Sequence, residues 1–320
     1  MIKSKESLMI IEDNHDFGNL LLKSLTSGFP EYDIKWFKSA AEAVEQFQNG
    51  FKPLCGWVDI ILPDFNGTEL SKHILNRQPE VKLIAMTGYT DPSLIKQALR
   101  YGFMDCIEKP FKADSLQEIT KLAIERYIIS KRKTLMIQDV KMMMEGGQSF
   151  QFSSVLSLIT MLEKQSGVLQ NISFQLTETA LKIGASLDMN ETDIKLLRYA
   201  ALLYDIGILP EEDINEETKR NTTTTSTFTL FKLILYIVRN IYEWYDGAGF
   251  PKQIKGENIP KLSRIISVAY GFTYLIMDRK HQKGLTEKHA FEEINSFKGK
   301  QYDPTIVETL EKILKKEKRI

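Results

Sequence analysis

The fold follows from the stretch LCGWVDIILPDFNG (residues 54–67), in which an apolar run ends at a single carboxylate, Asp59. A short apolar run of this kind is typical of a buried strand in a parallel sheet. Between this run and four others lie segments with apolar residues three or four positions apart, the spacing of amphipathic helices. Strands that alternate with helices predict an α/β fold with a doubly wound, five-stranded parallel sheet. We expect the strands at residues 8–11, 34–37, 54–58, 81–86 and 105–107.

Polar side chains follow four of these five strands. They are Glu12 and Asp13 after the first, Asp59 after the third, Thr87 after the fourth and Lys109 after the fifth. Because ligands bind at the carboxyl ends of the strands in such sheets, these side chains should lie together. Two carboxylates about 5 Å apart repel each other by roughly 3 kcal/mol at an effective dielectric constant of about 20, so the cluster needs a cation. Oxygen ligands favour Mg²⁺, which would assist an aspartate that attacks a phosphoryl group.

These residues lie in segments that resemble the receiver domains of two-component systems. The resemblance covers residues 7–125 and is carried by LMIIEDN (8–14), VDIILPDFNG (58–67), MTGY (86–89) and EKPF (108–111). It implies a flavodoxin-like receiver that is phosphorylated by a histidine kinase or a phosphotransfer protein.

The resemblance also assigns a role to each residue of the cluster. Asp59 is the implied phosphoacceptor, and Thr87 and Lys109 are the implied switch and phosphate contacts. The implied ligands of Mg²⁺ are Glu12, Asp13, Asp59 and the backbone carbonyl of Ile61. One position departs from the pattern, because Cys106 stands where receivers usually carry an aromatic residue, and Phe103 is the alternative carrier of that role.

Helical patterns dominate from residue 150 onward, so the second domain is predicted to be all-α. Residues 115–145 are predicted to form one long helix, which Gly146 and Gly147 would end. We therefore expect a receiver domain at 1–127, a helical linker at 128–148 and a helical domain at 149–320. Apolar residues recur along the linker, which favours either a solvated linker or a helix that pairs with a second copy in a homodimer.

The second domain resembles HD-GYP domains, the di-metal phosphodiesterases that hydrolyse cyclic di-GMP. The resemblance is carried by YAALLYDIGILPEE (199–212), YEWYDGAGFPKQIKGENIPKLSRIISVAYGF (242–272) and QYDPTIVETL (301–310). A di-metal hydrolase needs several histidine and carboxylate ligands, but the chain has only four histidines, of which two lie in the receiver. At the positions of the family's ligands stand Ile172, Tyr204, Asp205, Thr227, Ile241, Tyr242 and Tyr270. The resemblance therefore predicts a degenerate domain with no di-metal centre, no catalytic residues and no enzymatic activity.

The glycine-rich turn DGAGFP (246–251) fits the family pattern although the ligand positions do not. In one interpretation Gly247 and Gly249 allow backbone angles that other residues resist, while Phe250 and Pro251 fix the turn against the helices. In the other, an exposed Phe250 on a rigid turn binds a partner, for which the resemblance implies the diguanylate cyclase (GGDEF) class.

Composition limits the remaining classes of function. The chain has 42 basic and 42 acidic residues and no long apolar run, which argues against DNA and membrane as partners. Two cysteines and the absence of a secretory signal predict a cytoplasmic protein. The leading hypothesis is a response regulator whose second domain acts through protein contacts. The alternatives are an active cyclic di-GMP phosphodiesterase and a cyclic di-GMP sensor, the latter suggested by Arg279 and Lys283.

Overall fold

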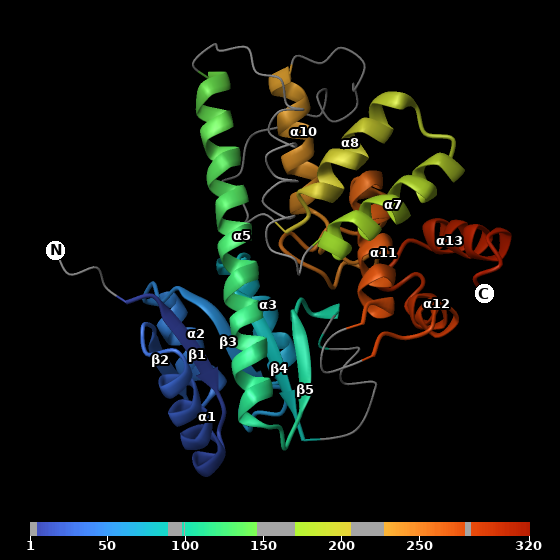
Figure 1. The fold of residues 1–320 in the computed structure, drawn as a ribbon. Helices are drawn as coiled ribbons and strands as arrows, with labels where there is room; N and C mark the ends of the chain where they lie inside the picture. Colours follow the sequence, from blue (N-terminus) through green and yellow to red (C-terminus); the bar gives the residue numbers. More distant parts are fainter. Residues whose placement is uncertain (1–4, 89–97, 99, 146–169, 206–226, 279–282) are drawn as a thin grey trace. The chain divides into compact units, whose positions relative to one another are not determined.

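A computed structural model of the protein describes residues 5–88, 98, 100–145, 170–205, 227–278 and 283–320 (Figure 1). The chain divides into two compact units, Met1–Lys131 and Arg132–Ile320, and the boundary falls inside a helix. No helix among the described residues has the length and apolar character that crossing a membrane requires.

The first unit is a five-stranded parallel sheet flanked by helices (Figure 1). The strand order is β2-β1-β3-β4-β5, the doubly wound order that the sequence predicted. The elements before the last helix of this unit are β1 (Ser7–Ile11), α1 (His15–Gly28), β2 (Asp33–Phe37), α2 (Ala40–Gln48), β3 (Pro53–Asp59), α3 (Gly67–Arg77), β4 (Lys82–Thr87) and β5 (Asp105–Glu108).

All five predicted strands are confirmed, each to within one residue at either end. Strand β3 is buried along its whole length, as expected of a central strand that helices cover on both faces. The register pairs Ile11 with Val58, Asp59 with Met86, and Thr87 with Glu108. Parallel pairing in this register brings the carboxyl ends of β1, β3, β4 and β5 to one edge of the sheet.

The predicted long helix is also confirmed. Helix α5 runs without interruption from Ala113 to Glu145. Its first half completes the receiver core with Leu116, Ile119 and Ala123, and Thr120 accepts a hydrogen bond from the indole of Trp57 at 3.0 Å. Its second half belongs to the second unit.

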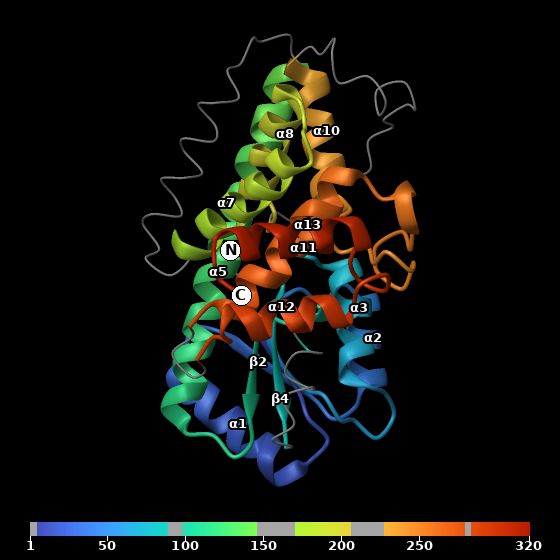
Figure 2. The ribbon, with the colours of Figure 1, turned by 90° about the vertical axis from the view of Figure 1, so that its right-hand side faces the viewer.

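The regular secondary structure described in the second unit is helical, which confirms the predicted all-α domain. Helix α7 packs against α8 and α11, and α11 also packs against α12 and α13 (Figure 2). The elements are α7 (Gln170–Ser186), α8 (Glu191–Leu202), α10 (Thr227–Arg239), the short 3₁₀ helix η1 (Gly256–Asn258), α11 (Lys261–Ile276), α12 (Glu287–Ser296) and α13 (Pro304–Lys316).

Candidate functional site

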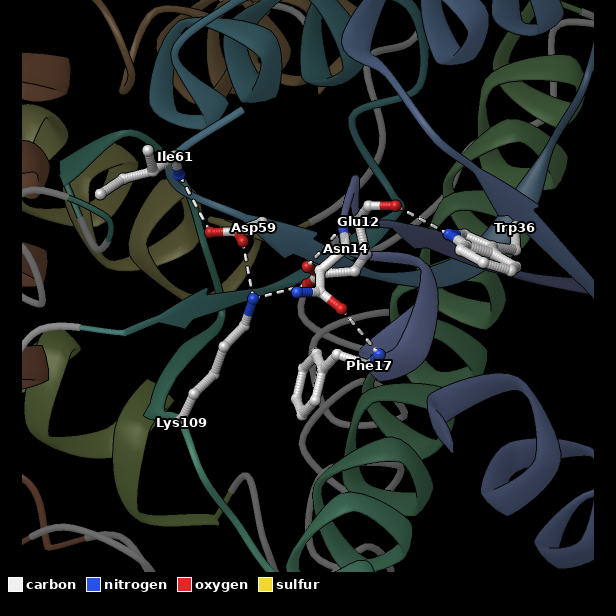
Figure 3. Close-up of polar contacts among 7 residues, drawn as sticks. All are labelled: Glu12, Asn14, Phe17, Trp36, Asp59, Ile61 and Lys109. Carbon is white, nitrogen blue, oxygen red and sulfur yellow. Dashed lines mark hydrogen bonds and ion pairs between the residues drawn. The ribbon is translucent and has the colours of Figure 1, made fainter. Parts of the chain in front are cut away.

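The edge of the receiver sheet gathers the acidic residues that the sequence singled out, of which Figure 3 shows Glu12 and Asp59. Glu12, Asp13 and Asp59 each present an oxygen atom, and these atoms lie within 4.8 Å of one another. Glu12 and Asp59 are buried, whereas Asp13 is exposed to solvent. Thr87, at the end of β4, is also fully buried, and its carbonyl oxygen accepts the backbone N–H of Lys109 at 2.7 Å.

Lys109 bridges the two buried carboxylates. Its Nζ atom lies 2.5 Å from Oε2 of Glu12 and 2.6 Å from Oδ2 of Asp59 (Figure 3). The same ammonium lies 4.7 Å from the ring centroid of Phe17, a distance suited to a cation–π contact. Burial raises the pKa of Glu12, while the hydrogen bond from Lys109 and its charge act in the opposite direction. One ammonium therefore holds together two carboxylates that would otherwise repel each other.

The cluster fits a divalent cation. Three carboxylates and one ammonium leave a formal net charge of −2 within a few ångströms. A hard cation with oxygen ligands would balance this charge, and an exposed side of the site, at Asp13, leaves room for water and a phosphoryl group. Mg²⁺ bound there would stabilise the charge that develops on the phosphoryl oxygens. Lys109 would hold a further phosphoryl oxygen. A carboxylate oxygen of Asp59 would bond to phosphorus while the bond from phosphorus to the donor atom breaks, and the donor would leave with that electron pair.

The turn that follows β3 fixes the carboxylate of Asp59. The N–H of Ile61 donates to Oδ1 of Asp59 at 3.0 Å (Figure 3). The N–H of Gly67 donates to the carbonyl of Ile60 at 2.8 Å. These contacts leave Oδ2 of Asp59 to Lys109. The role of the Ile61 carbonyl as a metal ligand stays a prediction, because its hydrogen bond to Asp59 involves the N–H of Ile61.

Three supporting residues were missed in the sequence. Asn14 caps α1 by accepting the N–H of Phe17 at 3.0 Å, and the indole of Trp36 donates to the carbonyl of Glu12 at 2.8 Å (Figure 3). These contacts hold the β1–α1 turn that carries Glu12 and Asp13. An asparagine just before an amphipathic helix is a recognisable capping signal, so Asn14 was within reach of sequence reasoning. Trp36 and Phe17 carry no such signal, because their roles depend on tertiary contacts.

Removing the ammonium should separate metal binding from phosphoryl transfer. In Lys109→Met we expect phosphorylation by a small phosphodonor to slow by about 100-fold, because a fixed positive charge no longer opposes the developing negative charge. Mg²⁺ should bind at least as tightly as in the wild type, because the metal-free cluster becomes more negative. Stopped-flow fluorescence of phosphorylation and calorimetric titration of Mg²⁺ measure the two effects.

The matched control for this variant is Lys112→Met, which removes an exposed lysine three residues further along. It should leave both measurements unchanged. A parallel fall in the Mg²⁺ affinity and the phosphorylation rate of Lys109→Met would show instead that Lys109 only maintains the local fold.

Neither of the two residues that the sequence named for the aromatic switch is exposed. Cys106 in β5 is buried, and Phe103 is completely buried among the residues before β5. A fully buried ring is a core side chain in this state, so Phe103 as the carrier of the switch role stays a prediction. Residue 89, which completes the MTGY segment, lies outside the described residues.

The second unit brings together four of the seven positions that the resemblance assigned to metal ligands. The ring centroids of Tyr204 and Tyr270 lie 5.5 Å apart, and those of Tyr242 and Tyr270 lie 6.5 Å apart. Burial raises the pKa of Tyr242, and the negative charge of Asp205 raises it further, which places that carboxylate beside the same cluster. The tyrosines and Asp205 thus form one partly buried cluster in the helical domain, which we call the HD site.

The other three positions are Ile172, Ile241 and Thr227. Ile172 and Ile241 are buried core residues. Thr227 is the first residue of α10, and residues 221–226 of the threonine-rich stretch lie outside the described residues. Arg279 also lies outside them, so the basic pair proposed for a dinucleotide is not described as a pair.

The side chain that completes the HD site was missed in the sequence. Lys133, from helix α5, is completely buried, and its Nζ lies 2.7 Å from Oδ1 of Asp205. The same atom lies 5.9 Å from the ring centroid of Tyr204. The sequence held one usable signal, since Ser130, Lys133 and Ile137 recur at helical spacing and all three prove to be buried.

The glycine-rich turn is an architectural element, and the interpretation with an exposed Phe250 is wrong. Phe250 is only 4% exposed, and its ring stacks on Tyr242 with centroids 5.3 Å apart and planes 4° apart. Gly247 adopts a positive φ of 90°, as predicted. Gly249 is required for a different reason, because a Cβ atom there would lie 2.2 Å from the backbone nitrogen of Trp244.

The buried carboxylate of Glu243 also stabilises this turn through a hydrogen bond. Glu243 is 2% exposed, and its Oε1 accepts the N–H of Lys252 at 2.6 Å. Burial raises the pKa of Glu243, while backbone N–H groups of residues 252–254 lower it. The turn is therefore held by polar contacts from inside as well as by the stacked rings.

Comparison with known proteins agrees with both halves of the chain. Residues 8–121 match the family described as response regulator receiver domain, and residues 156–306 match the family described as HD domain. A protein of Thermotoga maritima named cyclic di-GMP phosphodiesterase is 26% identical over 97% of this chain and 90% of its own length. The cyclic di-GMP phosphodiesterase response regulator RpfG of Xanthomonas campestris pv. campestris is 22% identical over 95% of this chain and 86% of its own length. A solved receiver domain of a DNA-binding response regulator from Colwellia psychrerythraea is 25% identical over 38% of this chain and 98% of its own, with a TM-score of 0.35.

The fold and the acidic site define a response regulator receiver domain, which is followed by a helical HD domain. Its relatives along nearly the whole chain are named as cyclic di-GMP phosphodiesterases, one of them also as a response regulator. The acidic cluster is the Mg²⁺ site of the receiver, and the implied upstream partner is a histidine kinase or a phosphotransfer protein.

The prediction that the chain is not an enzyme is wrong by this comparison. Both relatives are named phosphodiesterases, and they match the HD domain as well as the receiver. The prediction kept Asp205 as the one remaining ligand and treated the tyrosine positions as lost, although tyrosine oxygens also bind metals. The comparison likewise gives no support to the predicted absence of a di-metal centre.

Proposed function

We propose that the chain is a two-component response regulator in which phosphorylation of Asp59 controls the action of the HD domain. The observation that carries the proposal is the acidic cluster with Lys109 bound between Glu12 and Asp59, which is arranged for Mg²⁺-dependent phosphoryl transfer. The continuous helix α5 supports it further, because the last helix of the receiver is also the first helix of the second unit. The cytoplasmic location expected from the sequence stays a prediction.

For the output we propose contact with a signalling protein, such as one of the GGDEF class, that depends on the phosphorylation state. The second candidate is hydrolysis of cyclic di-GMP by the HD domain, which the names of the two full-length relatives favour. A substitution of Asp205, the carboxylate that defines the HD site together with the tyrosines, should distinguish these two outputs.

A turnover assay separates the two outputs. The purified chain is incubated with cyclic di-GMP and Mn²⁺, with and without a small phosphodonor, and the products are separated by chromatography. Turnover that Asp205→Ala abolishes supports hydrolysis as the output. Partner binding that changes with phosphorylation, in the absence of turnover, supports contact as the output. If neither turnover nor partner binding changes with phosphorylation, the whole proposal is contradicted.

We further propose that the chain forms a homodimer through helix α5. Ile128 and Leu135 are 37% and 50% exposed and lie seven residues apart, the repeat of a helix-pairing face. Arg132 and Asp139, on the same exposed side, provide charges that flank such a face. Sedimentation velocity at high concentration checks this, and a monomer in both phosphorylation states would rule it out.

A further inference from the structure

The pair formed by Lys133 and Asp205 is unusual for its burial. The Lys133 side chain is 0% exposed, that of Asp205 is 11% exposed, and the ion pair is 2.7 Å long. A buried ammonium without a counter-ion is costly, so the conformation of Lys133 depends on this carboxylate. Buried ion pairs add little net stability compared with apolar packing, which makes a purely stabilising role a poor explanation.

Lys133 lies on the helix that begins in the receiver domain. Helix α5 starts in the receiver core and crosses the boundary between the units at residue 131 without a break. Two residues later its lysine reaches the HD site. The buried residues Ser130, Lys133, Thr134 and Ile137 form one face of this helix, so a rotation or a shift of α5 moves Lys133 relative to Asp205.

A movement of Lys133 relative to Asp205 would affect several side chains of the HD site. Lys133 contacts Asp205 and also lies over the ring of Tyr204, which in turn contacts Tyr270. The charge of Asp205 acts on Tyr242, and Tyr242 stacks on Phe250 of the glycine-rich turn. Releasing the carboxylate from its counter-ion therefore affects the aromatic cluster and the turn together.

We propose that Lys133 is a positioning residue that holds the Asp205 carboxylate, and that it thereby makes the geometry of the HD site depend on the helix that leaves the receiver. The proposal rests on the proposed function, since it names how phosphorylation at Asp59 reaches the HD domain.

The first test is a double-mutant cycle on the full chain, read by hydrogen exchange of peptides that cover residues 196–205 and 241–250. Lys133→Met keeps the length and the helical preference of the side chain but removes the charge. We expect exchange in these peptides to become on the order of 100-fold faster, because Asp205 stays buried without its counter-ion. Asp205→Leu should have a similar effect, and the double variant should exchange no faster than either single variant. Independent, additive effects would overturn the proposal.

The second test asks whether the pair carries the signal. Phosphorylation should change exchange in the same peptides in the wild type and in the control Lys131→Met, which removes a lysine that is 46% exposed on the same helix. The change should be lost in Lys133→Met and restored in Lys133→Arg, which keeps the charge. A normal response in Lys133→Met would overturn the proposal by reducing Lys133 to a structural residue.

The two tests separate this proposal from the proposed function. The mutant cycle needs no phosphorylation, so a failure of Asp59 to accept a phosphoryl group counts against the proposed function alone. If Asp59 is phosphorylated and the HD site of the wild type does not respond, the receiver assignment stands and the role of Lys133 in signalling fails.

Discussion

Asp59→Asn is expected to abolish phosphorylation, with incorporation from a small phosphodonor at least about 100-fold below the wild type. The amide keeps the shape of the side chain and its contact with the N–H of Ile61, but it lacks the nucleophilic oxygen and the negative charge. Mg²⁺ affinity should fall as well, because one of three clustered carboxylates is lost. Phosphate-affinity electrophoresis measures the first effect and calorimetric titration the second.

The matched control is Asp64→Asn, five residues further along the chain, in the loop that follows β3. Asp64 accepts the N–H groups of Ala40 and Ala41 at 3.2 and 2.9 Å, at the start of α2 and away from the acidic cluster. Asp64 is exposed, and although some desolvation raises its pKa, the backbone hydrogen bonds from Ala41 and Ala40 lower it overall. Asp64→Asn should be phosphorylated at close to the wild-type rate. Equal labelling of Asp59→Asn and the wild type would remove Asp59 from its role.

The receiver site was predictable because its residues are tied to the ends of strands. Each apolar run predicted a strand, and the doubly wound order then brought Glu12, Asp59 and Lys109 to one edge. No side-chain geometry was needed for that step. The contacts of Trp36 and Phe17 were not predictable, because they depend on how α1 and β2 pack beside the cluster.

The HD site was predictable only in part, and the reason is also physical. A helical domain gathers its site from faces of several helices, so the spacing along one helix does not say which faces meet. The family pattern identified Tyr204, Asp205, Tyr242 and Tyr270, and the structure brings these together. It could not identify Lys133, because that residue arrives from a helix outside the family pattern. Nor could it show that Phe250 is buried, since its exposure depends on the stacking partner Tyr242.

Phe250→Ala tests the architectural role of the glycine-rich turn and should have the largest effect on stability. The ring is 4% exposed and stacks on Tyr242, so its removal leaves a cavity and deprives Tyr242 of its partner. Such a truncation costs about 3–5 kcal/mol. In a domain of this size that lowers the melting temperature by about 10 °C, which differential scanning calorimetry measures.

Phe174→Ala is the matched control for this prediction, because it removes the same side chain from α7 of the same domain at a position that is 63% exposed. A surface change of this kind alters stability by no more than about 0.5 kcal/mol, so the melting temperature should stay within about 2 °C. Partner binding by Phe250→Ala should fall only in proportion to the unfolded fraction, because the ring faces Tyr242 and the interior of the domain. A variant that keeps the wild-type melting temperature but no longer binds its partner would show the opposite, that Phe250 leaves Tyr242 and contacts the partner directly.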